Sequence, residues 1–306
     1  MRILFMGTPD FAVASLKALV EAGHEICGVF TQPDKPKNRG HKLAFSPVKE
    51  YALSRDLEVY QPLKMRDGEA LSMVQRLSPE LIVVAAYGKI LPEDILNTPR
   101  YGSINVHSSI LPKYRGAAPI NWAILNGETA TGVTIMYMAK ELDAGDIIRC
   151  AETAIAPDED ALTLTARLAE LGAGALLQAV DSIADGTVRR TPQVHEASTY
   201  APMLSRELSP MDFTKPALTL HDQVRGLIPW PCATADIKGS HLKVYRTEVS
   251  GDTAAPAGSV IAADKHGIDV ACGDGKVLRL LEVQAEGGKR MAAGAYLAGH
   301  PMETDL

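Results

Sequence analysis

The order of strand and helix signals over the first two hundred residues is what most limits the possible folds of this chain. Apolar runs at residues 2–6 (RILFM) and 80–88 (ELIVVAAYG) stop at turn-forming residues, and a segment with helical spacing, residues 11–23, follows the first run. Neighbouring parallel strands must be joined by a crossover, which is usually a helix, so repeated units of this kind predict a parallel sheet. We therefore expect an α/β fold: a Rossmann-like, mostly parallel sheet with helices on both faces.

The pattern changes near residue 190. Residues 187–212 show no clean periodicity and contain several turn formers, and one helical segment at 217–228 precedes five short strand candidates separated by Gly and Asp. Short strands with tight turns are typical of a small barrel or sandwich. The predicted organisation is an N-terminal domain at 1–189, a linker at 190–206 and a small C-terminal β-barrel (OB-like) domain at 207–306.

The composition is that of an ordinary globular protein. The 306 residues are 46% hydrophobic, and the formal net charge of −6 does not suggest a nucleic-acid binder by overall electrostatics, although a local basic patch is compatible with it. No apolar stretch approaches the roughly 20 residues of a membrane span, and the opening MRILFMGTPD predicts a first strand rather than a signal peptide. The four cysteines are not spaced as metal ligands. We expect a cytoplasmic protein that does not associate with a membrane.

The turn after the first strand, GTPDFA, resembles the start of a dinucleotide-binding motif but does not satisfy it. That motif needs glycine at its first, third and sixth positions, where this chain has Gly7, Pro9 and Ala12. Pro9 has no backbone N–H to offer a pyrophosphate. The turn is better interpreted as a tight connection at the carboxyl ends of the strands, where open α/β sheets bind ligands.

A segment from Ser103 to Gly127, SINVHSSILPKYRGAAPINWAILNG, concentrates the polar chemistry of the chain. Asn105 and His107 alternate along a predicted strand, so their side chains point to the same face, and the strand ends at His107. A lone histidine is usually structural. An amide donor beside a titratable imidazole can instead stabilise an oxyanion and move a proton, which acyl transfer requires.

A carboxylate could join this pair from the segment MAKELDAGDII. Asp143 lies in the turn after a predicted strand, and Asp146 opens the next one; on composition alone either is an ordinary turn acid. No serine or cysteine is placed as an activated nucleophile, and no GxSxG motif is present. Direct transfer between two bound substrates therefore fits better than a covalent acyl-enzyme.

These segments resemble the folate-dependent formyltransferase family. The resemblance rests on NVHSSILPKYRGAAPINWAI and LDAGDI, and it is extended by GTPDFA, TQPDKPKNRGHKL, SPVK, AAYGKILP and the PWP ahead of the C-terminal strands. It covers the chain from Met1 to about Leu281. Ile110 stands where the family usually has leucine, a swap of similar volume and polarity.

The resemblance implies roles for individual residues. Asn105, His107 and Asp143 match the three catalytic positions. The positions that match the folate site are Ser109, Ile110, Leu111 and Pro112 in the first turn and Lys89, Ile90 and Leu91 in YGKILP.

The resemblance also implies the substrates. The formyl donor would be 10-formyltetrahydrofolate, the acceptor would be the α-amine of methionine on initiator tRNA, and no metal would be needed. The loop DKPKNRGHK sets Lys35, Lys37, Arg39 and Lys42 against Asp34, and in the family this loop contacts the tRNA acceptor stem. By composition alone it would be a solvated surface loop. A monomer is expected.

Three other functions stay open at this point. A formyltransferase acting on a small amine, such as a sugar nucleotide, could use the same three catalytic residues, but it would need neither the basic loop nor the trailing β domain. A 10-formyltetrahydrofolate hydrolase would use water as the acceptor. A non-catalytic tRNA- or folate-binding module is disfavoured because Asn105, His107 and Asp143 are all present.

Overall fold

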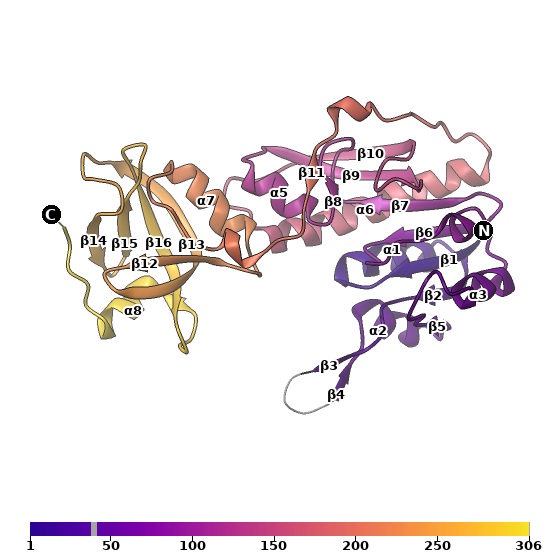
Figure 1. Cartoon of the computed structure of the whole chain (residues 1–306), viewed down its shortest axis with the longest axis horizontal. Helices are drawn as coiled ribbons and strands as arrows, with labels where there is room; N and C mark the ends of the chain where they lie inside the picture. Colours follow the sequence, from indigo (N-terminus) through magenta and orange to yellow (C-terminus); the bar gives the residue numbers. More distant parts are fainter. Residues whose placement is uncertain (38–41, 306) are drawn as a thin grey trace. The chain divides into compact units, whose positions relative to one another are not determined.

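A computed structural model of the chain describes residues 1–37 and 42–305. The chain forms two compact units, shown with their elements in Figure 1. The N-terminal unit comprises Met1–Pro119, Ala130–Thr153 and Thr165–Ala201. The C-terminal unit comprises Ile120–Thr129, Ala154–Leu164 and Pro202–Leu306.

The N-terminal unit is built on a seven-stranded sheet with the order β10-β9-β7-β6-β1-β2-β5. Strands β1, β2, β5, β6 and β7 pair in parallel, and β9 runs antiparallel to β7. The predicted mostly parallel sheet is therefore confirmed. The strand bounds are β1 Arg2–Gly7, β2 Glu25–Phe30, β5 Val59–Tyr60, β6 Leu81–Ala85, β7 Ser103–His107, β9 Ala130–Tyr137 and β10 Ile147–Ala154.

Helices cover both faces of this sheet, as the sequence predicts (Figure 1). Side chains alternate along β1: Leu4 and Met6 belong to a buried cluster that also contains residues of α3 and α4. On the opposite face, Gly172 of α6 lies so close to Val106 that a β-carbon there would approach it to 3.1 Å. The helix bounds are α1 Asp10–Glu21, α2 Pro47–Ser54, α3 Glu69–Leu77, α4 Glu93–Leu96 and α6 Ala161–Ala184.

The segment after α6, predicted as part of a linker, is hydrogen-bonded to the N-terminal unit along much of its length. Thr191 bridges Ile147, and β11 (Tyr200–Ala201) pairs in parallel with β8 (Arg115–Gly116). A short 3-10 helix, His195–Ala197, lies between these two attachments. We call residues 191–201 the strap. The predicted domain boundaries themselves stay predictions.

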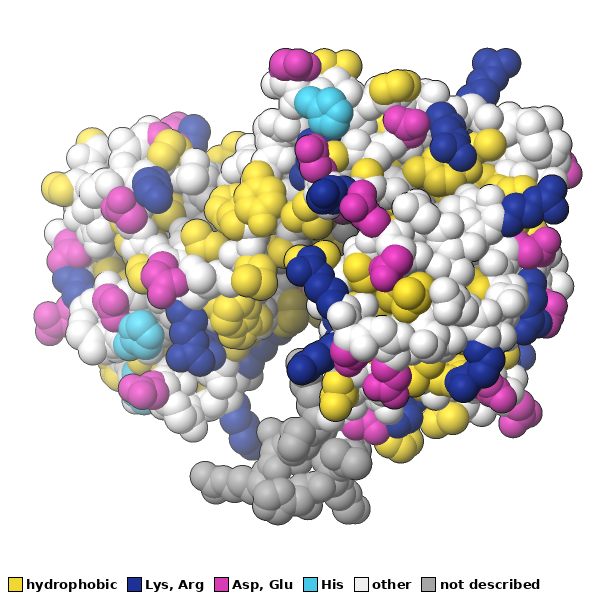
Figure 2. All heavy atoms as spheres, turned by 45° about the vertical axis from the view of Figure 1, so that its right-hand side comes forward, with side chains coloured by type: hydrophobic (Ala, Val, Ile, Leu, Met, Phe, Trp, Pro, Cys, Tyr) yellow, Lys and Arg dark blue, Asp and Glu magenta, His cyan; other side chains and the backbone are white. Residues whose placement is uncertain are grey.

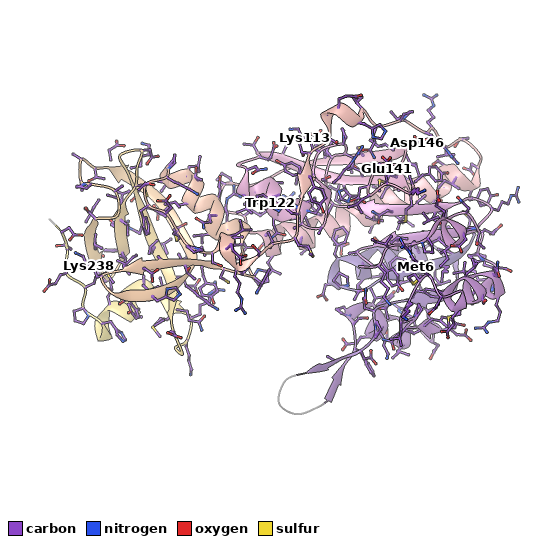
Figure 3. All side chains as sticks on the ribbon, viewed as in Figure 1. Met6, Lys113, Trp122, Glu141, Asp146 and Lys238 are labelled. Atoms are coloured by element: carbon purple, nitrogen blue, oxygen red, sulfur yellow. The ribbon has the colours of Figure 1, made fainter. Side chains whose placement is uncertain are left out.

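The C-terminal unit contains the five predicted strands in one antiparallel sheet, ordered β12-β13-β16-β15-β14, with β17 added on β16. Breaks in the register of β13 against β16 bend the long strands, as a small barrel-like sheet requires. The β12–β13 turn at Lys238 and Gly239 has positive φ at both residues, typical of tight hairpins (Lys238 is labelled in Figure 3). The bounds are β12 Ala233–Ile237, β13 Ser240–Asp252, β14 Val260–Asp264, β15 Gly267–Ala271, β16 Lys276–Ala285, β17 Met291–Ala292, α5 Pro119–Leu125, α7 Ala217–Gly226 and α8 Ala293–Gly299.

Candidate active site

Strand β7 carries Asn105 and His107 to the carboxyl edge of the sheet. The strand ends at His107, as predicted, and the two residues share one face because they are two positions apart. Asn105 pairs with Val84 of the neighbouring parallel strand β6, so the segments that follow β6 and β7 leave the sheet at the same edge. His107 is 5% exposed and Asn105 is half-buried.

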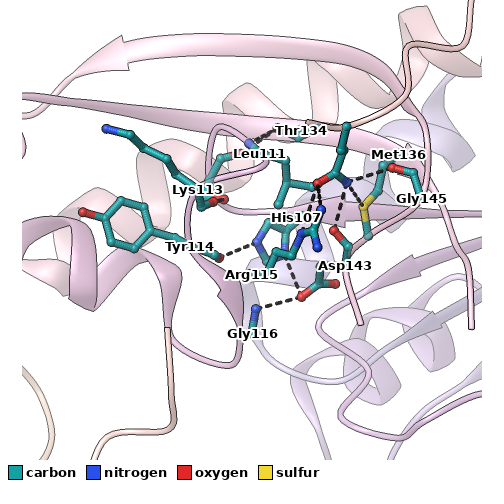
Figure 4. A network of polar contacts seen from close by, with 12 residues as sticks. His107, Leu111, Lys113, Tyr114, Arg115, Gly116, Thr134, Met136, Asp143 and Gly145 are labelled. Carbon is teal, nitrogen blue, oxygen red and sulfur yellow. Dashed lines mark hydrogen bonds and ion pairs between the residues drawn. The ribbon is translucent and has the colours of Figure 1, made fainter. Parts of the chain in front are cut away.

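The His107 ring is held by a backbone carbonyl on one side and faces a carboxylate on the other (Figure 4). Nε2 lies 2.9 Å from the Tyr114 carbonyl oxygen, which can only accept, so Nε2 carries a proton. Nδ1 lies 3.7 Å from Asp143 Oδ2, which is longer than a hydrogen bond. Nδ1 is therefore the ring nitrogen that faces the Asp143 carboxylate without being hydrogen-bonded to it.

Asp143 lies in the loop between β9 and β10, and its carboxylate is fixed from a third segment. Its Oδ2 accepts a hydrogen bond of 2.9 Å from the Gly116 backbone N–H. Asp143 itself has a φ of 49°, a left-handed conformation that aspartate tolerates better than most residues. The nearby Glu141 and Asp146 are labelled in Figure 3. Of the two candidate acids, Asp143 is the one whose carboxylate faces His107.

The turn after β7 is shaped by internal hydrogen bonds. The Ser109 hydroxyl donates to the Lys113 carbonyl at 2.7 Å, and the Thr134 hydroxyl donates to the Ser109 carbonyl at 2.7 Å. The Leu111 N–H donates to Thr134 Oγ1 at 3.1 Å. Ser109 and Leu111 are buried, while Ile110 and Pro112 are half-buried. Ser109 and Leu111 therefore shape the turn from its buried side.

The segment Lys89–Leu91, after β6, combines one tethered and one exposed side chain. Lys89 Nζ donates to the carbonyls of Pro62 and Leu63, and burial lowers the pKa of its ammonium group. Ile90 is 73% exposed, whereas Leu91 is buried. Ile90 is thus an exposed apolar side chain in the segment that follows β6.

The predicted basic loop begins and ends as a hairpin. Strands β3 (Lys35–Lys37) and β4 (Lys42–Ala44) pair antiparallel, with Lys37 opposite Lys42. Arg39, and the side chains of Lys35, Lys37 and Lys42, lie outside the part of the chain that the structure describes.

A cluster of polar side chains anchors the base of this hairpin. Lys49 Nζ, on α2, donates to Asp34 Oδ2 at 2.6 Å and to Gln61 Oε1 at 3.0 Å, and it lies 4.1 Å from the centre of the Phe45 ring. Gln61 Nε2 donates to Asp34 Oδ1 at 2.8 Å. The hydrogen bond from Lys49 holds the pKa of the Asp34 carboxyl below its usual range, so the contact is ionic at neutral pH. Asp34 precedes β3 and Phe45 follows β4, so this cluster fixes both ends of the hairpin.

Comparison with known proteins identifies the family. Residues 1–180 match the formyl transferase model and residues 203–301 match the model of the formyl transferase C-terminal domain. The methionyl-tRNA formyltransferase of Acetivibrio thermocellus is 48% identical over 302 residues, which are 98% of this chain and 97% of the relative. That of Trichlorobacter lovleyi is 47% identical over 301 residues, 98% of this chain and 95% of the relative. The chain belongs to the methionyl-tRNA formyltransferase family.

Solved structures share the fold of this formyltransferase at much lower identity. HypX from Aquifex aeolicus in complex with tetrahydrofolic acid has a TM-score of 0.65 and 18% identity, covering 100% of this chain and 48% of that one. The N-formyltransferase from Helicobacter canadensis, with folinic acid and dTDP-3-aminofucose, has a TM-score of 0.71 and 18% identity, covering 91% of this chain and 98% of that one. At this identity the similarity establishes the fold alone.

Sequence reasoning missed one side chain that this formyltransferase brings into the site. Gln193, on the strap, contacts Arg115 and the backbone of the Asp143 loop. It lies in TPQVHEAS, which has no periodicity and was expected to be linker. The only available signal was a polar amide beside a proline, which is too common to distinguish a site residue.

The described residues also bear on two other expectations. Within residues 1–37 and 42–305, no helix combines the length and apolarity that crossing a membrane requires. In the same ranges, no three His, Cys, Asp or Glu side chains gather closely enough to hold a metal ion.

Proposed function

We propose that this formyltransferase moves the formyl group of 10-formyltetrahydrofolate to the α-amine of methionine on initiator tRNA, and so supports translation initiation. The observation that carries the proposal is the arrangement at the end of β7. There His107 presents Nδ1 toward Asp143 at 3.7 Å and shares a face with Asn105. The full-length similarity to methionyl-tRNA formyltransferases supports the choice of acceptor.

Asn105 and His107 would stabilise the charge that develops during the reaction. The attacking α-amine must be neutral, which is accessible near pH 7 because its pKa is about 8. Attack on the formyl carbon places negative charge on the formyl oxygen. The Asn105 amide and the Nδ1–H of protonated His107 can both donate to that oxygen, and donors held in place before the reaction need no reorganisation.

Asp143 would handle the proton that the amine loses. The amine becomes positively charged as its bond to the formyl carbon forms, and Asp143 accepts its proton, directly or through one water. The bond between the formyl carbon and the folate nitrogen then breaks, and that nitrogen takes a proton from the His107–Asp143 pair. The scheme uses no covalent intermediate on the protein and no metal.

The folate donor would be bound at the edge shared by β6 and β7. Ile90 is exposed there, and the residues of the turn, Ser109 to Pro112, are held by hydrogen bonds to Thr134 and Lys113. Two buried side chains in the turn leave backbone groups as the natural partners of a pterin ring. We therefore assign Lys89–Leu91 and Ser109–Pro112 to the donor site.

The tRNA would contact the basic hairpin and the C-terminal β domain. The C-terminal residues from Arg206 onward carry 11 Lys+Arg and 13 Asp+Glu, and Figure 2 shows both signs mixed on the face it draws. One cation does lie against an aromatic ring: Arg290 is 4.4 Å from the centre of the Tyr245 ring, and Lys243 and Arg246 lie within two residues of Tyr245 in β13. Such a mixture of cations and an aromatic ring suits phosphate and base contacts.

We also propose the domain division implied by this assignment: a catalytic domain at 1–189, a linker at 190–206 and a tRNA-binding domain at 207–306. The matched family models, at 1–180 and 203–301, support it. The same assignment places the enzyme in the cytoplasm as a monomer.

The test is a comparison of acceptors. Initial rates of formyl transfer from 10-formyltetrahydrofolate would be measured with methionyl-initiator tRNA, with a dTDP-amino sugar and with water alone. We expect the tRNA to be preferred in kcat/KM by at least ~10³-fold, because only it engages the hairpin and the C-terminal domain. A higher kcat/KM for the amino sugar, or hydrolysis as fast as transfer, would contradict the proposal.

A further inference from the structure

The Gln193 side chain is a buried amide that uses both of its ends. It is 6% exposed. Its Oε1 accepts from Arg115 Nε at 3.1 Å and from Arg115 Nη2 at 2.7 Å. Its Nε2 donates to the Asp143 carbonyl at 2.9 Å and to the Gly145 carbonyl at 2.8 Å. Figure 4 labels these three partners.

The partners determine which way the amide points. A guanidinium can only donate and a backbone carbonyl can only accept, so the oxygen must face Arg115 and the nitrogen must face the loop. In the opposite orientation, all four contacts would be repulsive. Gln193 therefore connects β8, which contains Arg115, to the loop after β9, which contains Asp143.

The loop needs such a connection at this position. Asp143 adopts a φ of 49°, a left-handed conformation that strains a residue with a side chain, although aspartate less than most, so contacts around the loop help to hold it. Gly145 passes so close to β9 that a β-carbon there would lie 1.9 Å from the Tyr137 carbonyl oxygen. The residues just before Asp143, Lys140 to Leu142, are exposed, so packing of their side chains does little to fix the loop.

We propose that Gln193 is a positioning residue that sets the distance between the Asp143 carboxylate and His107. It fixes the backbone of Asp143 from the strap side, while the Gly116 N–H fixes the carboxylate itself. Of the strap, Gln193 is the residue whose side chain contacts the Asp143 loop. This inference rests on the proposed role of Asp143.

Two variants separate positioning from mere structural support. Gln193→Met keeps the length of the side chain and removes its hydrogen bonds to Arg115, Asp143 and Gly145. Gln193→Glu keeps the acceptor for Arg115 but turns a carboxylate oxygen toward the two carbonyls. Val194→Ala, at the neighbouring exposed position of the strap, is the matched control.

We expect both Gln193 variants to lower kcat by roughly 10- to 100-fold, because a displacement of about 1 Å in a catalytic group has effects of this size. KM for the folate donor and for methionyl-tRNA should change by less than about threefold, since Asp143 acts on the transition state rather than on binding. Turnover is normalised to the folate-binding stoichiometry, and Tm is measured for each variant. Val194→Ala should match the parent.

The outcome for Gln193→Glu is decisive. If the amide mattered only through Arg115, this variant would behave as the parent while Gln193→Met lost activity, and the proposal would be overturned. Near-normal kcat in both variants, or loss of folding in both, would overturn it as well. His107→Ala is run alongside: if it too retained turnover, the failure would lie with the proposed catalytic site and not with Gln193.

Discussion

The proposed catalytic corner, formed by His107, Asp143 and Gln193, and the basic hairpin of the same unit are built in opposite ways. In the corner, His107, Asp143 and Gln193 come from three separate segments and are fixed by hydrogen bonds between buried groups. In the hairpin, the four cations lie within eight consecutive residues, and the tertiary contacts described for it are at its base, around Lys49. One region depends on geometry across the fold, and the other depends on local charge.

This difference suits the role proposed for each region. A proton transfer or an oxyanion contact loses most of its value when the donor moves by about 1 Å. Attraction between a cation and a phosphate falls off slowly with distance and tolerates several arrangements. We therefore expect substitutions in the corner to act on kcat and substitutions in the hairpin to act on KM for tRNA.

The largest effect is expected at His107. His107→Ala removes the donor at Nδ1 and the group that faces Asp143, so kcat should fall by ~10²-fold or more with little change in KM. Asp143→Asn keeps the acceptor for the Gly116 N–H and removes the charge, and should lose a similar factor. Steady-state kinetics with both substrates measure this. A His107→Ala enzyme with near-normal kcat would contradict the catalytic roles proposed for His107 and Asp143.

A tenfold effect is expected at Arg39. Arg39→Ala should raise KM for methionyl-tRNA about tenfold and reduce the salt slope of log(kcat/KM) by about one, because a bidentate phosphate or base contact is lost. Its kcat and the affinity for folate should stay at the parent values. Initial rates at several salt concentrations measure both quantities. Arg189→Ala makes the same charge change at an exposed site of the N-terminal unit and serves as the control. If both variants gave the same KM and salt slope, Arg39 would make no specific contact with the tRNA.

A smaller effect is expected at Ile90, in the proposed folate site. Ile90→Asp should weaken binding of the folate donor roughly fivefold, the equivalent of about 1 kcal/mol of apolar contact. Its exposure makes it a better probe than Leu111, where a buried carboxylate would damage the fold itself. Calorimetric titration with the folate gives the affinity. Leu53→Asp, exposed on α2, controls for the added charge, and unchanged folate affinity in Ile90→Asp would place the donor elsewhere.

The smallest effect is expected at the base of the hairpin. Lys49→Met removes the ion pair with Asp34 and keeps the length of the side chain, so KM for methionyl-tRNA should rise about threefold, because the hydrogen bond from Gln61 to Asp34 stays in place. Lys17→Met, on the exposed surface of α1, is the control for net charge. Steady-state kinetics with methionyl-tRNA distinguish the two. A fall in kcat instead of a rise in KM would show that the two regions are coupled, and would end the distinction drawn between them.

Much of the fold could be predicted from the sequence because its strands and helices show in local residue patterns. Strands β1 and β6 are apolar runs ended by turn formers, β7 alternates apolar and polar residues, and the five C-terminal strands are separated by Gly and Asp. Local patterns of this kind determine which segments are strands and which are helices, and right-handed crossovers then leave few topologies. The shared face of Asn105 and His107 follows from strand alternation alone.

The sequence by itself therefore determined the class of the sheet, the shared face of the Asn-x-His pair and the concentration of cations in the hairpin, because each depends on residues close together in the chain. The tertiary structure decided which acid faces His107 and that His107 presents Nδ1, since these depend on the Tyr114 carbonyl and the Gly116 N–H. It also decided that Gln193, 50 residues after Asp143, belongs to the corner. No local pattern records a contact made across such a separation. The contact exists because the strap pairs with Arg115 and Ile147.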